Sequence, residues 1–158
     1  MIEKFPKLTV SIALYKTTYL ESLFNTLKSQ TYKNVEYIIS NDQPNNPETK
    51  KFSDKMEDEF KDVKVFNHFK PLGAIKNYDF CFEKSNGKYF IRIDDDDDFK
   101  HCDHLEKMVF EIEKGYDFVL ANVDIETIRN NKLIGIKEKS LVNFKHCESQ
   151  YDFAQYSI

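Results

Sequence analysis

Runs of consecutive apolar residues alternate along the chain with segments in which apolar residues recur every three or four positions. The continuous runs are typical of strands that are buried on both faces of a parallel sheet, and the wider spacing is typical of helices with one apolar face. Strands are expected at residues 8–14, 35–39, 63–66, 88–93 and 117–123. Helices are expected from about Leu20, Pro47, Ala74 and Leu105. This alternation predicts an α/β fold, in which helices flank a mostly parallel sheet.

Capping residues mark where several of these helices begin. Thr18 and Glu21 match the capping-box pattern at the start of the first helix. Asn46 followed by Pro47 is typical of the cap and first turn of the second helix. Gly73 interrupts the chain just before the third helix, which is expected to extend to about residue 84.

The last part of the chain has a different pattern. Asn130-Asn131 separates the segments 125–128 and 133–136, which predicts a β-hairpin. We expect residues 1–123 to form the core and residues 124–158 to form a small hairpin-and-helix extension of the same domain. A chain of 158 residues is long enough for one domain with a buried core.

The charge balance narrows the class of protein. The chain has 23 Lys and Arg against 27 Asp and Glu, a formal net charge of −4. Five of the acidic residues are consecutive aspartates at 94–98, and without them the balance is 23 against 22 (27 minus 5). The acidity is therefore local. A nucleic-acid-binding protein would show a basic stripe, so that class of partner is not expected.

Cysteine usage and hydropathy indicate the compartment. Cys81, Cys102 and Cys147 are widely spaced and odd in number, which is typical of a reduced protein. The chain has no apolar run near the roughly 18 residues that a membrane span requires. Residues 1–6 lack the apolar core of a signal peptide. We expect a cytoplasmic protein without a transmembrane segment, with peripheral membrane contact left open.

The five aspartates are the strongest candidate for chemistry. Neighbouring carboxylates repel one another and burial raises that cost, and a divalent cation with oxygen ligands would relieve it. If the strand stays extended, Asp94 and Asp96 share one face. Right-handed crossovers bring the ends of the first, second and fourth strands to one edge, where Tyr15 and Asp42 would join the aspartates in a ligand cleft. The plain alternative is a solvated acidic loop.

Six short motifs follow one another between residues 8 and 123. They are residues 8–16 (LTVSIALYK), 19–20 (YL), 29–32 (SQTY), 35–42 (VEYIISND), 86–89 (NGKY) and 93–99 (IDDDDDF). In this order they resemble the landmarks of the inverting family 2 glycosyltransferases of the GT-A fold, and the last is similar to the D-x-D signature. Lys16 stands where the family pattern has Asn, and Asn41 replaces the first Asp of a D-D-G-S motif.

The resemblance implies roles for individual residues. Asp96 would be the main metal ligand, with Asp97 beside it, and the ion would be Mn²⁺ or Mg²⁺. The implied nucleotide contacts are Tyr15 on the base, Asp42 on a base N–H, Lys76 on the diphosphate, and Asp94 and Asp95. Arg92 lies within the fourth expected strand and is either a counter-charge for the aspartates or a residue that extends into solvent.

The implied activity is that of a hexosyltransferase. It would move a sugar, with inversion and with the help of the metal, from a UDP-linked or similar nucleotide-diphospho-sugar to a saccharide or lipid-linked acceptor, as in polysaccharide biosynthesis. Such transfer needs a general base. Glu148 and Asp152, acidic residues near the end of the chain, are the candidates, and neither is assigned that role. Two alternatives remain open. One is a truncated, non-catalytic module that binds nucleotide-sugar and metal, which the early end of the chain favours. The other is a two-metal enzyme such as a nucleotidyltransferase, in which Asp42 could supply the further carboxylate, but the order of the motifs argues against it.

Overall fold

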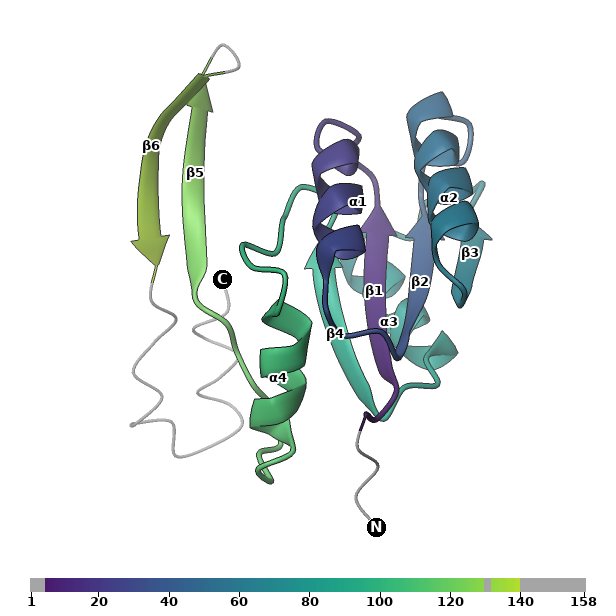
Figure 1. The fold of residues 1–158 in the computed structure, drawn as a ribbon. Coiled ribbons are helices and arrows are strands. Elements are labelled where there is room, and N and C mark those ends of the chain that lie inside the picture. The colour runs from purple at the N-terminus through teal and green to yellow at the C-terminus, as the bar shows by residue number, and fades with distance from the viewer. Residues whose placement is uncertain (1–4, 130–131, 140–158) are drawn as a thin grey trace. The chain divides into compact units, whose positions relative to one another are not determined.

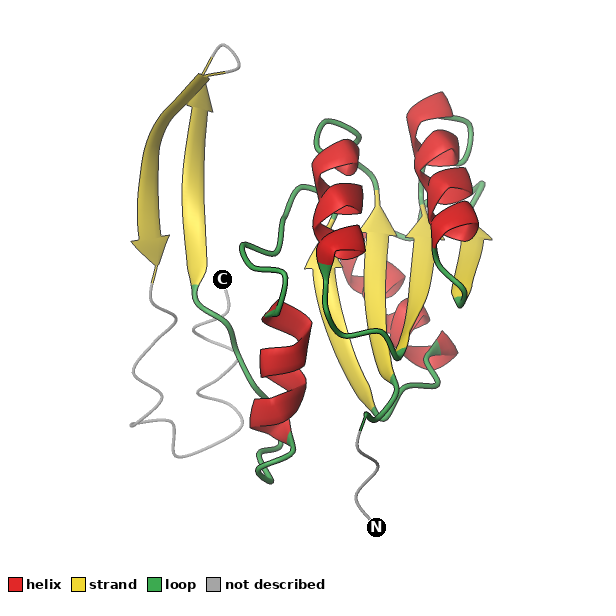
Figure 2. Cartoon of the chain, in the orientation of Figure 1, coloured by secondary structure: helices red, strands yellow, loops and turns green. Residues whose placement is uncertain are grey.

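The computed structural model describes residues 5–129 and 132–139 of the 158-residue chain. The chain divides into two compact units, Met1–Glu113 and Lys114–Ile158, and each is described by itself. Strands and helices alternate in the first unit, and two antiparallel strands form the described regular structure of the second (Figure 2). Every helix within the described ranges is too short or too polar to cross a membrane.

A four-stranded parallel sheet forms the centre of the first unit (Figure 1). The strands are β1 (Leu8–Leu14), β2 (Val35–Asn41), β3 (Val63–Asn67) and β4 (Tyr89–Asp94), and their order in space is β3-β2-β1-β4. The helices are α1 (Leu20–Ser29), α2 (Pro47–Glu59), α3 (Ala74–Lys84) and α4 (His104–Ile112). In Figure 1, α1 and α2 lie over one face of the sheet and α3 lies over the other. The predicted α/β class is confirmed.

Burial follows the position of each strand in the sheet. β1 and β2 are the two central strands, and nearly all of their residues are buried. β3 and β4 are the edge strands, and most of their residues are only half-buried. The apolar face of α1 packs onto the centre through Leu23 and Leu27, which are fully buried. Two-sided burial is the reason why β1 and β2 appear in the sequence as continuous apolar runs.

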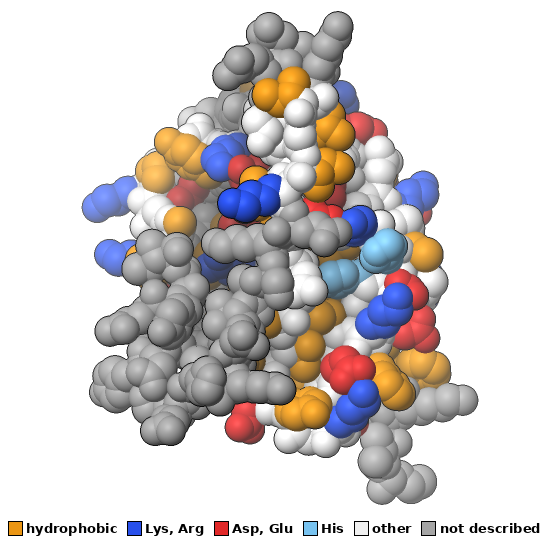
Figure 3. Space-filling view, turned by 90° about the vertical axis from the view of Figure 1, so that its left-hand side faces the viewer, with side chains coloured by type: hydrophobic (Ala, Val, Ile, Leu, Met, Phe, Trp, Pro, Cys, Tyr) orange, Lys and Arg blue, Asp and Glu red, His pale blue; other side chains and the backbone are white. Residues whose placement is uncertain are grey.

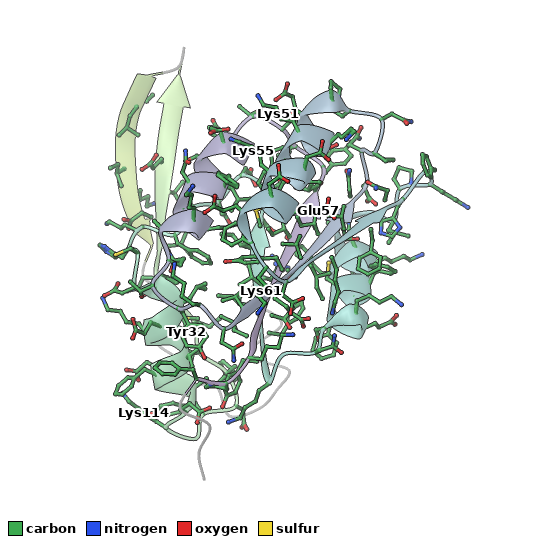
Figure 4. The ribbon with its side chains drawn as sticks, turned by 45° about the vertical axis from the view of Figure 1, so that its right-hand side comes forward. Tyr32, Lys51, Lys55, Glu57, Lys61 and Lys114 are labelled. Carbon is green, nitrogen blue, oxygen red and sulfur yellow. The ribbon has the colours of Figure 1, made fainter. Side chains whose placement is uncertain are left out.

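The starts of two helices test the capping predictions. Asn46 caps α2 as predicted, because its side chain accepts a hydrogen bond from the Glu48 amide at 3.0 Å. The capping box at Thr18 is wrong: the cap residue of α1 is Tyr19, which makes no side-chain cap bond. The reason is that Glu21 does not reach back to the cap. Its carboxylate instead pairs with Lys55 of α2 at 2.6 Å, on the side of the unit that Figure 4 shows.

A buried carboxylate holds the amino ends of the strands together, at the edge opposite the aspartates. Glu36 of β2 accepts hydrogen bonds from Thr9 at 2.6 Å and from Lys64 at 2.9 Å, and from the Asn86 amide. Burial alone would raise the pKa of Glu36, but these bonds outweigh it and lower the pKa to about 2. Gly87 follows directly, and a Cβ there would lie 2.5 Å from the Thr9 amide nitrogen. The turn that precedes β4 is therefore fixed to β1.

The second unit contains the predicted hairpin. β5 (Val123–Arg129) pairs antiparallel with β6 (Lys132–Lys139), with a register shift at Thr127/Ile128. The predicted strand at 117–123 is wrong for residues 117–122, which form no strand. Phe118 and Leu120 are exposed, and a short apolar run does not by itself determine a strand. The remainder of the expected extension, residues 140–158, lies outside the described residues.

Candidate functional site

The carboxyl ends of β1 and β4 define the candidate site. The chain runs from β1 outward through β2 to β3, and then returns to place β4 on the other side of β1. The connections therefore reverse direction between β1 and β4. Crevices at such switch points, outside the carboxyl ends of the strands, are the usual ligand sites of open α/β sheets. The aspartates at 94–98 follow β4 at this point.

Asp95 fastens the two strand ends to each other. Its Oδ2 atom accepts hydrogen bonds from the backbone amides of Tyr15, at 2.6 Å, and Lys16, at 2.5 Å. The side chain is buried, and this burial raises the pKa of the Asp95 carboxyl, while the two amide bonds oppose the rise. Asp95 thus extends the connection between β1 and β4 beyond their last paired residues, whereas sequence reasoning had given it only a nucleotide contact.

The aspartate run turns instead of continuing the strand. β4 ends at Asp94, and the Asp97 amide donates to the Asp94 carbonyl at 3.1 Å. The expectation that Asp94 and Asp96 share a face because the strand stays extended is therefore wrong. A hydrogen-bonded turn, and not strand alternation, sets the direction of each carboxylate.

Asp94 has two partners from neighbouring elements. The hydroxyl of Tyr78, on α3, donates to Asp94 Oδ1, and Arg92 Nε lies 3.6 Å from the same oxygen. The Arg92 guanidinium also lies over the Tyr78 ring, 4.4 Å from its centroid. Burial, and then the bond to Asp94, raise the pKa of the Tyr78 hydroxyl well above its ordinary value. Arg92 thus lies beside Asp94, while its side chain is 59% exposed, so the position agrees both with a partial counter-charge and with a residue that extends into solvent.

The next aspartates face solvent. The ammonium of Lys16 lies 2.5 Å from Asp96 Oδ2, and Asp96 raises the pKa of Lys16. Partial desolvation, and then the charges of Asp94, Asp96 and Asp98, raise the pKa of Asp97. Ser22 donates a hydrogen bond to Asp98. The turn therefore carries more negative charge than its protein partners neutralise.

Three other predicted site residues lie on neighbouring loops and on α3. Asp42 directly follows β2, is buried, and accepts the amides of Leu72 at 3.1 Å and Gly73 at 2.9 Å. Gly73 has φ +78° and precedes α3, whose first turn carries the exposed Lys76. The Asp42 amide donates to the Leu14 carbonyl at 3.0 Å, which places it next to the end of β1. The Tyr15 side chain is 64% exposed and open to a stacking partner.

Polar side chains on α1, together with its C-cap residue Gln30, hold the segment after the aspartates. Thr26 donates to the Phe99 carbonyl at 2.6 Å. The buried Gln30 donates to the His101 carbonyl at 2.9 Å and accepts the Leu105 amide at 3.1 Å. Together with Ser22, these residues follow one another at intervals of four, which is one side of a helix. Sequence reasoning missed them, although this spacing is visible in the sequence.

The exposed carboxylates of the acidic turn suit a divalent ion that is bound partly by the protein and partly by the phosphates of a ligand. Within residues 5–129 and 132–139, no group of three or more His, Cys, Asp or Glu side chains is arranged to hold a metal. Mg²⁺ in nucleotide-dependent enzymes is usually held by one or two carboxylates together with phosphate oxygens and water. Asp96, which pairs with Lys16, and Asp97, which lies among like charges, offer two exposed carboxylates. They therefore fit Mn²⁺ or Mg²⁺ as part of a phosphate complex, and not a closed protein cage.

Comparison with known families gives a match over most of the chain. The model for glycosyl transferase family 2 matches residues 9–152. Among curated proteins, EpsH of Bacillus subtilis (strain 168), which is assigned as a glycosyltransferase, is 32% identical over 77% of this chain. An uncharacterised glycosyltransferase of Haemophilus influenzae is 29% identical over 72% of it. The chain spans only 35% of the length of each relative.

Solved structures show the same fold. S. aureus TarS 1-349, determined in complex with UDP-GlcNAc, has a TM-score of 0.61 and 20% identity over 68% of this chain and 31% of its own. The mannosyltransferase PcManGT from Pyrobaculum calidifontis, in complex with GDP-Man and Mn²⁺, has a TM-score of 0.58 and 14% identity, and the match covers 32% of that protein. The expected GT-A architecture is confirmed.

Proposed function

The chain belongs to glycosyl transferase family 2, and on that premise we propose that it transfers a sugar from a UDP-linked nucleotide-diphospho-sugar with inversion, dependent on Mn²⁺ or Mg²⁺. One observation carries the proposal: Asp95 bonds the turn after β4 to the end of β1. This bond brings the acidic turn beside Tyr15, and Asp42 is joined to the same strand end. An aromatic ring, a carboxylate and an acidic turn thus meet at one sheet edge.

The nucleoside would occupy the side of Tyr15 and Asp42. The exposed Tyr15 ring provides a surface on which a base can stack. Asp42 uses its carboxylate for two loop amides, yet a carboxylate has about four acceptor positions, so it can also accept from a base N–H. Asp94 and Asp95 would lie toward the nucleotide, and the Lys76 ammonium, in the first turn of α3, would attract the diphosphate.

The leaving nucleoside diphosphate would be stabilised next to the acidic turn at residues 94–98. Asp96 and Asp97 would hold the ion, and a bound Mn²⁺ or Mg²⁺ would neutralise the charge that develops on the leaving nucleoside diphosphate. Tyr78 and Arg92 hold Asp94 in one orientation beside it. The acceptor would be a saccharide or a lipid-linked saccharide. Glu148 and Asp152, the acidic residues considered as a general base, lie outside the described residues.

The net charge of −4 suits a small anionic ligand bound through a metal more than a polyanion. Among the described side chains that are visible in Figure 3, acidic and basic ones are interspersed, and the basic ones form no stripe there. A nucleic acid would need such a stripe. A diphosphate needs only a few cations at one point, which the metal and Lys76 would supply.

Calorimetry with UDP-, GDP- and dTDP-sugars, with and without Mn²⁺, tests the donor site. We expect a UDP-sugar to bind in the presence of Mn²⁺, and Asp96→Asn to abolish that dependence on metal. Failure of every nucleotide to bind would contradict the proposal.

A second assay addresses transfer itself. We expect UDP to be released from the bound sugar nucleotide when saccharide acceptors and Mn²⁺ are present, and the release to depend on Asp96. Binding without release would instead support the alternative of a non-catalytic nucleotide-sugar module.

A further inference from the structure

The Lys16 ammonium lies next to Asp96, the residue that would bind the metal. Its Nζ atom lies 2.5 Å from Asp96 Oδ2, and the pair is partly exposed, with side-chain exposures of 58% and 33%. The Lys16 backbone is held independently, because its amide donates to Asp95. The Lys16 backbone, which is hydrogen-bonded to the acidic turn, thus positions the ammonium next to Asp96.

A divalent ion and this ammonium need the same oxygen. An ion bound to Asp96 Oδ2 at an ordinary ligand distance would lie within a few ångströms of Nζ, and two cations at that distance repel. At about 4 Å in water, the repulsion between single charges corresponds to about fivefold in affinity, and a double charge raises this to about thirtyfold. Lys16 can rotate into solvent, but then it loses its partner.

We propose that Lys16 is a tethered counter-ion that competes with the divalent metal for Asp96. The inference rests on the proposed metal-dependent function and adds a residue to it. The apo site is then held closed to free metal by Lys16. A ligand that brings its own negative charge, such as a diphosphate, would offer the ammonium a new partner and open Asp96 to the ion. The position is also one where this sequence departs from the family pattern, with Lys in place of Asn.

The test measures Mn²⁺ binding to the full 158-residue chain without nucleotide, from the electron paramagnetic resonance signal of free Mn²⁺. Lys16→Met removes the charge and keeps the length of the side chain, whereas Lys16→Arg keeps the charge. Lys107→Met is the matched control. Lys107 pairs with Asp103 at 2.8 Å with exposures of 68% and 39%, so it resembles the Lys16 pair but lies on α4.

We expect Lys16→Met to bind Mn²⁺ about fivefold to thirtyfold more tightly than the wild type. Lys16→Arg and Lys107→Met should stay near the wild-type value, and Asp96→Asn should cancel the gain of Lys16→Met. Unchanged, weaker or undetectable Mn²⁺ binding by Lys16→Met would overturn the inference, as would an equal gain in Lys107→Met.

The inference and the proposed function can fail separately. If no nucleotide binds while Lys16→Met still gains Mn²⁺ affinity through Asp96, the donor function fails and the counter-ion role stands. If a UDP-sugar binds with Asp96-dependent use of metal while Lys16→Met has no effect on Mn²⁺ affinity, only the counter-ion role fails.

Discussion

Single carboxylates within the aspartate run have different surroundings, although their sequence context is nearly uniform. Asp95 is buried and bonds two amides, Asp96 is exposed and pairs with an ammonium, and Asp97 is surrounded by like charges. A repeated residue type therefore serves both as a structural clamp and as open ligand atoms. The difference arises from the turn at Asp94, which points consecutive side chains in different directions.

The orientation of Asp94 can be tested with Tyr78→Phe. This change removes the hydroxyl that donates to Asp94 and keeps the ring beneath the Arg92 guanidinium. One hydrogen bond is worth about 1 kcal/mol, so we expect UDP affinity in the presence of Mn²⁺ to fall by about fivefold. Calorimetric titration of the variant against the wild type provides the measurement.

A double-mutant cycle separates positioning from general stability. In an Asp94→Asn background the hydroxyl has lost its charged partner, so adding Tyr78→Phe should change UDP affinity little further. Fully additive effects of the two substitutions would show that Tyr78 acts elsewhere. Unfolding in denaturant, measured on the same variants, reports any loss of folded protein.

At the scale of elements, one side of α1 packs into the core and another side supports the loop after the aspartates. Leu23 and Leu27 pack into the core, while Ser22, Thr26 and the C-cap residue Gln30 bond the chain that runs from Asp98 toward α4. A loop that follows a strand end has little regular structure to hold it in place. The polar side of α1 provides this support through side chains, and we infer that it limits the motion of the acidic turn.

Thr26→Val tests this support. The substitution keeps the branched shape and removes the hydroxyl that donates to the Phe99 carbonyl at 2.6 Å. We expect the free energy of unfolding to fall by about 1 kcal/mol, and Mn²⁺ affinity to fall as well, because Asp97 lies two residues before Phe99. Denaturant unfolding and Mn²⁺ titration give the two values.

Ser29→Ala is the matched control for that change. The Ser29 hydroxyl bonds to the Thr26 carbonyl within the same helix, so its removal leaves the loop contacts in place. Equal loss of Mn²⁺ affinity in both variants would argue that α1 as a whole, and not its bond to the loop, affects the site.

At the scale of the whole molecule, the sequence predicts the elements whose residues are buried on both faces. It does not predict features that depend on contacts between distant segments. The runs at β1 and β2 could be identified because both faces of those strands are covered. The run at 118–120 is similar in composition but forms no strand, which no local pattern reveals. Hydrophobic periodicity thus located the central sheet better than the chain that follows α4.

The candidate site divides in the same way. The motif order placed Tyr15, Asp42 and the aspartates at one edge, because parallel strands with right-handed crossovers leave few other arrangements. The partners of those residues were not foreseen. Lys16 reaches Asp96 across 80 positions of sequence, and Tyr78 reaches Asp94 from another element. Such pairings depend on the packed backbone, so sequence spacing carries no signal for them.

The stability of the whole molecule should depend on pH through Glu36. The side chain is fully buried and its folded pKa is about 2, below the ordinary value of 4.5. Between these pH values the unfolded chain takes up a proton at Glu36 that the folded chain does not. The stability that Glu36 contributes is therefore fully present above about pH 4.5 and is lost as the pH falls toward 2. The shift of 2.5 units corresponds to about 3 kcal/mol.

Denaturant unfolding between pH 6 and pH 2.5, compared in the wild type and Glu36→Gln, isolates this contribution. Asp95 and Asp97 have raised pKa values, so their protonation favours the folded state as the pH falls and opposes the Glu36 effect. Those two groups remain in both proteins, and their effect cancels in the difference. The variant should be less stable at pH 6 and should lose less stability on acidification. Parallel curves for the two proteins would mean that the bonds to Glu36 from Thr9, Lys64 and Asn86 do not hold the carboxylate ionised.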